Sequence, residues 1–455
     1  MTTRARGAAL GPVYAVLAFA IPLSLSLTAP LSPQGGDTVP AKLGMHVLQC
    51  EQSFDLGGVS WLREQALAGK RPYYAVVTED QTRLVSTWGP APALWGSLTT
   101  MPLPVGLDVD DETLARRARK SAALAVGLAC LFLFMAIAER NGATLALVGA
   151  LTAGLSFAGA AVLGQALWQQ TVALPFLAAS WWGLSRGVVR PGRPYPLVAA
   201  CVLATAAGWI RPADAVVALT TLVLAGRALL ETRSRATIGL ALAGVAFVVA
   251  AFASWNQFQF GTWFPVGQAI THRGEESLFV NDPGAVGLAL AALLWSPSRG
   301  LLVFAPVVVV AIVTGARSNR VARSLSLALL VQLVVCSAFY KWWGGVTFGP
   351  RLTASLVWAS CFVLFGLVDA RAIPKRLAAA TVAVTVAVGL VGLYGYDPRK
   401  WDLLLGVDAS PEVVWSVPDN VVLASLRPLP PDSPSIQDSP SGPFRYCVAR
   451  TLSPE

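Results

Sequence analysis

Long apolar segments recur along this chain and constrain its fold more than any other feature. The hydrocarbon core of a bilayer is about 30 Å thick, and a helix needs roughly 20 apolar residues to cross it. Windows of that kind follow one another from near the N-terminus to about residue 395. A segment that crosses lipid must satisfy its own backbone hydrogen bonds, so these windows predict helices. We therefore expect an all-α polytopic membrane protein.

The apolar windows predict about eleven transmembrane helices. They are centred near residues 9–29, 121–138, 143–161, 167–184, 194–210, 213–230, 236–254, 300–315, 325–341, 353–370 and 377–395. An odd number of crossings places the two ends of the chain on opposite sides. Two weaker apolar stretches, residues 91–107 and 284–295, are expected to dip into the outer leaflet. Counting either as a crossing would invert the topology that follows.

Charge is sparse and patterned. Only 13% of the residues are charged, against about 25% in an ordinary soluble domain. The net charge of +9 comes from short basic clusters between apolar windows, which indicates topology rather than nucleic-acid binding. The clusters expected on the cytoplasmic side contain Arg4, Arg6, Arg140, Arg186, Arg190, Arg193, Arg227, Arg233, Arg235, Arg317, Arg320, Arg323, Arg371, Lys375 and Arg376. We expect a multi-pass protein of a bacterial plasma membrane, with the N-terminus cytoplasmic and the C-terminus outside.

The outer connections carry most of the polar sequence. We expect a transmembrane domain, residues 1–395, with a long outer loop, residues 31–120, after the first span, and an exported tail, residues 396–455. Four basic residues within 116–120 contradict the positive-inside rule, and acidic residues precede them. This pattern predicts an amphipathic helix on the membrane surface, with its basic side chains near lipid phosphates.

The cysteines fall into two classes. Two of them, Cys50 and Cys447, lie in the outer polar segments, where an oxidising compartment would allow a disulfide. The sequence leaves open whether they meet, because a disulfide requires Cα atoms within about 7 Å. The other four lie in apolar windows, where a small side chain packs well, and are Cys130, Cys201, Cys336 and Cys361.

An acidic residue stands just beyond the first span. Asp37 lies between Gly36 and Thr38, at the expected membrane boundary. A carboxylate at that depth can meet a lipid headgroup on one side and a water-borne acceptor on the other, and partial burial would tune it as a base. The alternative is a solvated acid beside a turn.

Three arginines are placed by the topology at the outer ends of spans. They are Arg211, Arg299 and Arg351. A guanidinium at headgroup level suits bidentate contact with phosphate. The alternatives for each are a structural ion pair and a lipid anchor.

Other chemistries have little support in the sequence. The chain has two histidines, His46 and His272, so a histidine-rich metal site is excluded. A glycine-rich nucleotide loop after a strand is also missing. We therefore expect no cofactor, and the energy for any reaction must come from the substrate.

These segments, in this order, resemble the GT-C class of integral membrane glycosyltransferases, in particular the bacterial branch related to protein O-mannosyltransferases and the aminoarabinose transferase. The resemblance concerns the architecture of nearly the whole chain. The local matches are Gly36, Asp37 and Thr38; Leu167, Trp168 and Gln169; Arg211 and Pro212; Asn256, Phe260 and Gly261; residues 296–302; and residues 343–351.

The resemblance implies a GT-C-like fold and a lipid-linked-sugar-dependent glycosyltransferase, which moves a sugar from a polyprenyl-phosphate carrier to an acceptor on the outer face. It makes Asp37 the base that deprotonates the acceptor. The acceptor would be a glycan, a lipid or a protein, and membrane lipids would surround the enzyme. Residues implied to bind the donor phosphate are Lys42, Arg211, Arg299 and Arg351, and those implied to line the substrate cavity are Trp343, Gly349, Asn256, His272 and Gln169.

Two departures from the family and three other functions remain open. Many relatives carry a second acid between the third and fourth spans, where this chain has Gln165, Gln169 and Gln170, and Lys42 replaces an arginine. The other functions are a transporter or flippase of lipid-linked saccharides, a polymerase or ligase of envelope polysaccharide, and a non-catalytic envelope assembly protein. A transporter would need ionisable groups midway through its spans, and these spans have few.

Overall fold

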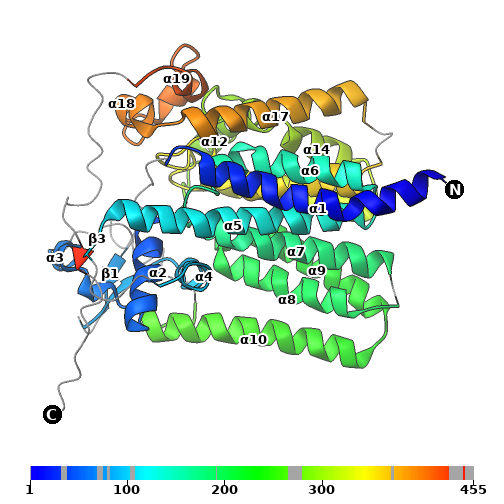
Figure 1. Cartoon of the computed structure of the whole chain (residues 1–455), viewed down its shortest axis with the longest axis horizontal. Coiled ribbons are helices and arrows are strands. Elements are labelled where there is room, and N and C mark those ends of the chain that lie inside the picture. The colour runs from blue at the N-terminus through cyan, green and yellow to red at the C-terminus, as the bar shows by residue number, and fades with distance from the viewer. Residues whose placement is uncertain are drawn as a thin grey trace.

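The computed structural model describes residues 2–31, 38–68, 75–78, 82–102, 108–190, 192–264, 279–369, 373–429 and 444–445. Most of these residues are helical, and the long helices lie side by side in one bundle (Figure 1). The described strands form two small antiparallel pairs, β1 (Ala75–Val77) with β2 (Leu84–Ser86), and β3 (Asp108–Val109) with β4 (Phe444–Arg445).

Seven of the described helices are long and apolar enough to cross a membrane. They are α1 (Thr2–Thr28), α5 (Asp111–Ala138), α7 (Gln169–Val189), α9 (Ala215–Glu231) with its leading turn η5 (Pro212–Asp214), α10 (Arg235–Phe260), α15 (Arg320–Ala338) and α17 (Lys375–Gly395). The prediction of a helical, multi-pass membrane protein is therefore confirmed.

The predicted number of eleven crossings stays a prediction. The remaining predicted windows fold into helices that are shorter than a full span. They are α6 (Ala143–Leu155), followed by the short π-helix η4 (Phe157–Ala161); α8 (Tyr195–Ile210); α13 (Leu301–Phe304) with α14 (Val307–Ala316); and α16 (Ala354–Phe362), followed by the short π-helix η7 (Val363–Leu367). The two weaker stretches also form helices, α4 (Ala91–Thr99) and α12 (Pro283–Trp295).

The connections expected on the cytoplasmic side meet at one end of the bundle. Arg186 and Arg190 of α7 pair with Glu139 at the end of α5, at 2.8 and 3.3 Å. Asn141 donates a hydrogen bond to the Phe365 carbonyl at 2.6 Å, and Asn319 donates one to Leu367. The elements of the first outer loop and of the tail lie at the opposite end, away from the N-terminus (Figure 1). Four of the connections that the charge pattern grouped together, at residues 139–141, 186–190, 319 and 365–367, thus lie at the same end of the bundle. The side of the membrane on which they lie stays a prediction.

The expected surface helix at residues 116–120 is wrong. These basic residues belong to the first turns of α5, one continuous helix of 28 residues. A helix of that length measures about 42 Å, so its first turns extend beyond a hydrocarbon layer of about 30 Å. Arg117 donates to Gln49 at 2.6 Å, and Arg119 donates to the Ala29 carbonyl at 2.8 Å. Contacts with α2 and with the end of the first span therefore hold the side chains of Arg117 and Arg119.

The first outer loop packs onto the bundle through its first helix, α2 (Val39–Glu51). Ala41 and Met45 of α2 share a buried apolar cluster with Leu167 and Ile210. The rest of the loop, with α3 (Ser60–Leu67) and the β1–β2 pair, forms a small core of its own around Leu43 and Leu62. The start of α2 is thereby held against the residues that precede Trp168 and Arg211.

The described part of the tail also belongs to the main core. It contains η9 (Pro398–Lys400), α18 (Asp402–Leu405), η10 (Pro411–Trp415) and α19 (Val421–Ser425). Trp401, Val414 and Val421 are buried in the same apolar cluster as the membrane helices. Residues 396–429 are therefore an integral cap on the end of the bundle opposite the N-terminus (Figure 1).

Candidate functional site

Arg211 lies at the corner between α8 and α9, with 3% of its surface exposed. Its guanidinium forms an ion pair with Asp214 and donates a hydrogen bond to the Leu352 carbonyl at 3.1 Å. Asp214 also accepts a hydrogen bond from Ser355 at 2.6 Å. These bonds join the α8–α9 corner to the beginning of α16, where Arg351 lies.

Arg351 opens the short turn η6 (Arg351–Thr353) and is 8% exposed. Its guanidinium carbon lies 4.0 Å from the centre of the Trp168 ring, at the start of α7. Stacking on an indole face fixes the plane of a guanidinium and leaves its edge for hydrogen bonds. Trp168, Arg211 and Arg351 thus come from three separate connections, and the contacts with Trp168 and with the Leu352 carbonyl bring them to one end of the bundle. We call these three residues the outer arginine site.

Lys42 is buried in α2, and its amine lies 2.6 Å from a carboxylate oxygen of Asp111. This ion pair joins the start of α2 to the start of α5. Thr38, the residue before α2, is fully buried. Asp37, the predicted base, lies outside the described residues, and so do His272 and Cys447.

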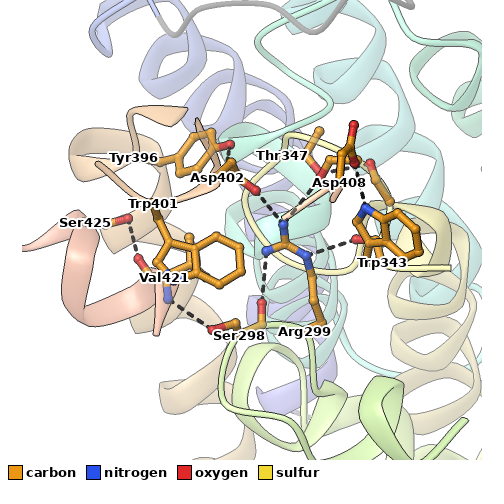
Figure 2. Close-up of polar contacts among 12 residues, drawn as sticks. Ser298, Arg299, Trp343, Thr347, Tyr396, Trp401, Asp402, Asp408, Val421 and Ser425 are labelled. Atoms are coloured by element: carbon orange, nitrogen blue, oxygen red, sulfur yellow. Dashed lines mark hydrogen bonds and ion pairs between the residues drawn. The ribbon is translucent and has the colours of Figure 1, made fainter. Parts of the chain in front are cut away.

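Arg299 has a different environment, shown in Figure 2. It is fully buried, and its guanidinium donates to the carbonyls of Trp343, Ser298 and Gly345 at 2.9, 3.0 and 3.3 Å. It also pairs with Asp402 of α18 at 2.7 Å. The structure shows a buried ion pair both for Arg299 and for Arg211. We leave Arg299 out of the proposed phosphate site because three carbonyls also accept from its guanidinium, against one for Arg211.

Asp402 holds the tail to this arginine. Its second oxygen accepts a hydrogen bond from the Tyr396 hydroxyl at 2.5 Å (Figure 2). Burial raises the pKa of Asp402 to about 6, although the positive charge of Arg299 opposes that change. Asp408 extends the network by accepting from the Trp343 indole at 2.8 Å. The loop that precedes Arg351 is therefore bonded to the tail in two places, through Arg299 to Asp402 and through Trp343 to Asp408.

Three other residues predicted to line a cavity are described, and that role stays a prediction for each of them. Gly349 has φ of +75°, and a Cβ added there would lie 2.7 Å from the Phe304 ring, so it is needed for a tight turn in the core. Asn256 is buried and donates to the Phe252 carbonyl in its own helix at 2.9 Å. Gln169 is the half-buried first residue of α7.

Sequence reasoning missed the acids that hold two of the arginines. Asp214 follows Arg211 by three residues, a spacing that the sequence displays. Asp402 gives no such signal, because 103 residues separate it from Arg299. Among the described residues, no group of three or more His, Cys, Asp or Glu side chains is placed to hold a metal ion.

Cys50 is disulfide-bonded, whereas Cys130, Cys201, Cys336 and Cys361 are free. Cys50 packs on the loop core that contains Val109, and Val109 pairs with Phe444 of β4. β4 thus reaches a residue of this core, Val109, three residues before Cys447. This placement supports the predicted pairing with Cys447, which stays a prediction.

His46 provides a pH test of the first outer loop. It is 1% exposed, and its burial, with the nearby charge of Arg117, lowers its pKa from 6.5 to about 4. Between these values the unfolded chain binds a proton that the folded loop excludes, so stability falls as the pH drops from 6.5 to 4. We expect a loss of up to about 3 kcal/mol.

Limited proteolysis of the first outer loop at pH 7.5 and 4.5 measures this effect. The wild type should become more susceptible at the lower pH. The H46Q variant lacks the titrating ring and should show a smaller change between the two values. An equal change in both proteins would contradict the assignment to His46.

Comparison with known proteins finds no matching family model and no matching curated protein. The function is therefore proposed from the sequence pattern and from the geometry of the outer end.

Proposed function

We propose that this chain is a glycosyltransferase that moves a sugar from a polyprenyl-phosphate carrier to an acceptor on the outer face of the membrane. The observation that carries the proposal is the outer arginine site. Two buried arginines, Arg211 and Arg351, lie at one end of a membrane helix bundle. Arg211 bonds to the carbonyl of Leu352, the residue after Arg351, and Arg351 lies over the indole of Trp168. Buried charges at that depth mark functional sites in membrane proteins.

A lipid phosphate suits this location because its chain stays in the bilayer while its headgroup reaches the end of the helices. Arginine presents a planar set of N–H donors that matches two phosphate oxygens. Negative charge accumulates on the phosphate as the sugar leaves, so fixed cations beside it stabilise the transition state. Lys42, already paired with Asp111, would act at the edge of the site.

In the proposed reaction, Asp37 accepts the proton of an acceptor hydroxyl. The acceptor oxygen then bonds to the anomeric carbon while the bond from that carbon to the phosphate oxygen breaks. The bonding electrons leave with the polyprenyl phosphate, and the configuration at the anomeric carbon inverts. The start of α2 packs through Ala41 on Leu167 and Ile210, the neighbours of Trp168 and Arg211. This packing brings the segment that follows Asp37 to the outer arginine site.

Binding of polyprenyl phosphate to the chain in lipid nanodiscs tests the site. The R351K variant keeps the charge but loses the planar pair of donors, so we expect roughly tenfold to hundredfold weaker binding. The matched control is R227K, because Arg227 is half-exposed and pairs only loosely with Glu231, at 3.6 Å. Equal affinity of R351K and wild type would contradict phosphate binding at Arg351.

A further inference from the structure

The start of α5 carries a basic surface that the proposed reaction does not use. It lies at the end of the bundle opposite the N-terminus (Figure 1) and consists of Arg116, Arg117, Arg119 and Lys120. At about 100° per residue, these four positions cover an arc of about 160° on one side of the helix. The Arg116 side chain is 63% exposed, and Lys120 is exposed as well. The helix thus presents cations to its surroundings within about one turn.

Most of this charge has no acidic partner. Arg116 pairs with Glu112, one turn earlier on the same helix. Arg117 and Arg119 donate to uncharged oxygens, one of a side-chain amide and two of backbone carbonyls. Within the described part of the chain, neither of them nor Lys120 forms an ion pair with an acidic side chain. The excess of positive charge favours an anionic ligand.

The order of residues along α5 places this surface at the edge of the hydrocarbon layer. Residues 121–138 contain no charged side chain and measure about 27 Å as a helix, close to the thickness of that layer. The basic residues come directly before them, and the acids of residues 110–112 lie farther out. Phospholipid phosphates lie just outside the hydrocarbon. The basic turns are therefore at the level of the lipid phosphates.

An exposed apolar surface lies beside the basic one. The Trp95 indole of α4 donates to the Ser121 carbonyl at 3.0 Å, so α4 lies against α5 where the uncharged stretch begins. Leu98, in the last turn of α4, is 82% exposed, and Met101, just after it, is 89% exposed. The Met101 carbonyl accepts a hydrogen bond from Arg117. Because exposed apolar side chains are more stable in hydrocarbon than in water, this surface suits acyl chains.

We propose that the start of α5 and the end of α4 bind an anionic phospholipid of the leaflet at this end of the bundle. Its phosphate lies against Arg116 and Lys120, to which the buried Arg117 adds its charge, and its acyl chains pack on Leu98 and Met101. A zwitterionic phospholipid offers the same chains, but a cation in its headgroup offsets its phosphate. It therefore gains less from the excess positive charge. Binding at this site does not depend on the proposed sugar transfer.

Quenching of a fluorescent label by brominated lipids measures lipid selectivity at one position of the chain. The label is attached to L94C, one turn before Leu98 on α4, since Leu94 is 40% exposed and the free cysteines among the described residues are buried. In nanodiscs of mixed composition, we expect brominated phosphatidylglycerol to be preferred about tenfold over brominated phosphatidylcholine with the same chains. The R116Q/K120Q variant should reduce this preference to less than about twofold. R116K/K120R, which keeps both charges, should retain it.

The matched control carries the label at F247C in the middle of α10, where Phe247 is 74% exposed. No preference is expected there. A preference of equal size at Phe247, equal quenching by the two lipids at Leu94, or a preference at Leu94 that survives R116Q/K120Q would overturn the proposal. Displacement of phosphatidylglycerol by a small mole fraction of polyprenyl phosphate would also overturn it, since the site would then belong to the sugar carrier. Thermal unfolding of each variant shows that a loss of selectivity is not a loss of fold.

Discussion

The D37N variant is expected to lose at least about 100-fold in the rate of sugar transfer, because it lacks the group that accepts the acceptor proton. The amide has nearly the shape of the carboxylate, so the chain should insert and fold normally. Its affinity for polyprenyl phosphate should remain close to that of the wild type, since the phosphate contacts are assigned to Arg211 and Arg351. The measurement is the initial rate of transfer at saturating donor, with binding measured in parallel.

The control for this variant is E51Q, which neutralises an exposed acid at the far end of α2. It should transfer at the wild-type rate. If D37N also transferred at that rate, Asp37 would not be the base, although the outer arginine site would still stand. If D37N instead lost donor binding, Asp37 would serve the fold or the donor.

The R299M variant is expected to lose about 3–5 kcal/mol of stability, the usual cost of leaving one partner of a buried ion pair alone. Arg299 and Asp402 are both fully buried, and the hydrogen bonds of this arginine join residues 343–345 to the tail (Figure 2). Loss of the arginine should therefore release residues 396–429. Thermal unfolding in detergent and proteolysis of the tail measure the two effects.

Two further variants make this prediction specific. K341M removes a half-exposed ion pair with Asp408 in the same region and should cost at most about 1 kcal/mol. The double variant R299M/D402L replaces the buried pair by apolar side chains and should recover much of the loss. Equal stability of R299M and K341M would contradict the structural role of Arg299.

The sequence predicted membrane helices and grouped the connections between them because both depend on local patterns. An apolar window forms a membrane helix wherever it occurs, and clusters of arginine mark the connections on one side. The same logic placed Arg211, Arg299 and Arg351 at one end of the bundle, where the structure has them. The order of the spans decides which end of the bundle a residue reaches, whatever side chains it contacts there.

The roles of those arginines depend on contacts that no local pattern contains. Arg299 and Arg351 looked alike in the sequence, yet Arg299 meets Asp402 from the tail, whereas Arg351 lies over Trp168. Phe54, Trp88 and Trp255 likewise line one small pocket beside α2, although they come from distant segments of the chain. The continuous helix α5 was missed for a related reason, since the partners that hold its basic turns lie elsewhere in the chain.

Sugar transfer by the purified wild-type chain distinguishes a transferase from a transporter most directly. The chain would be reconstituted in liposomes with a polyprenyl phosphate that carries a labelled sugar, and water-soluble glycans would be supplied outside. We predict that the label becomes covalently attached to a glycan and that an equal amount of free polyprenyl phosphate is released. Label that stays on its carrier, while the carrier moves between the leaflets, would contradict the proposed function.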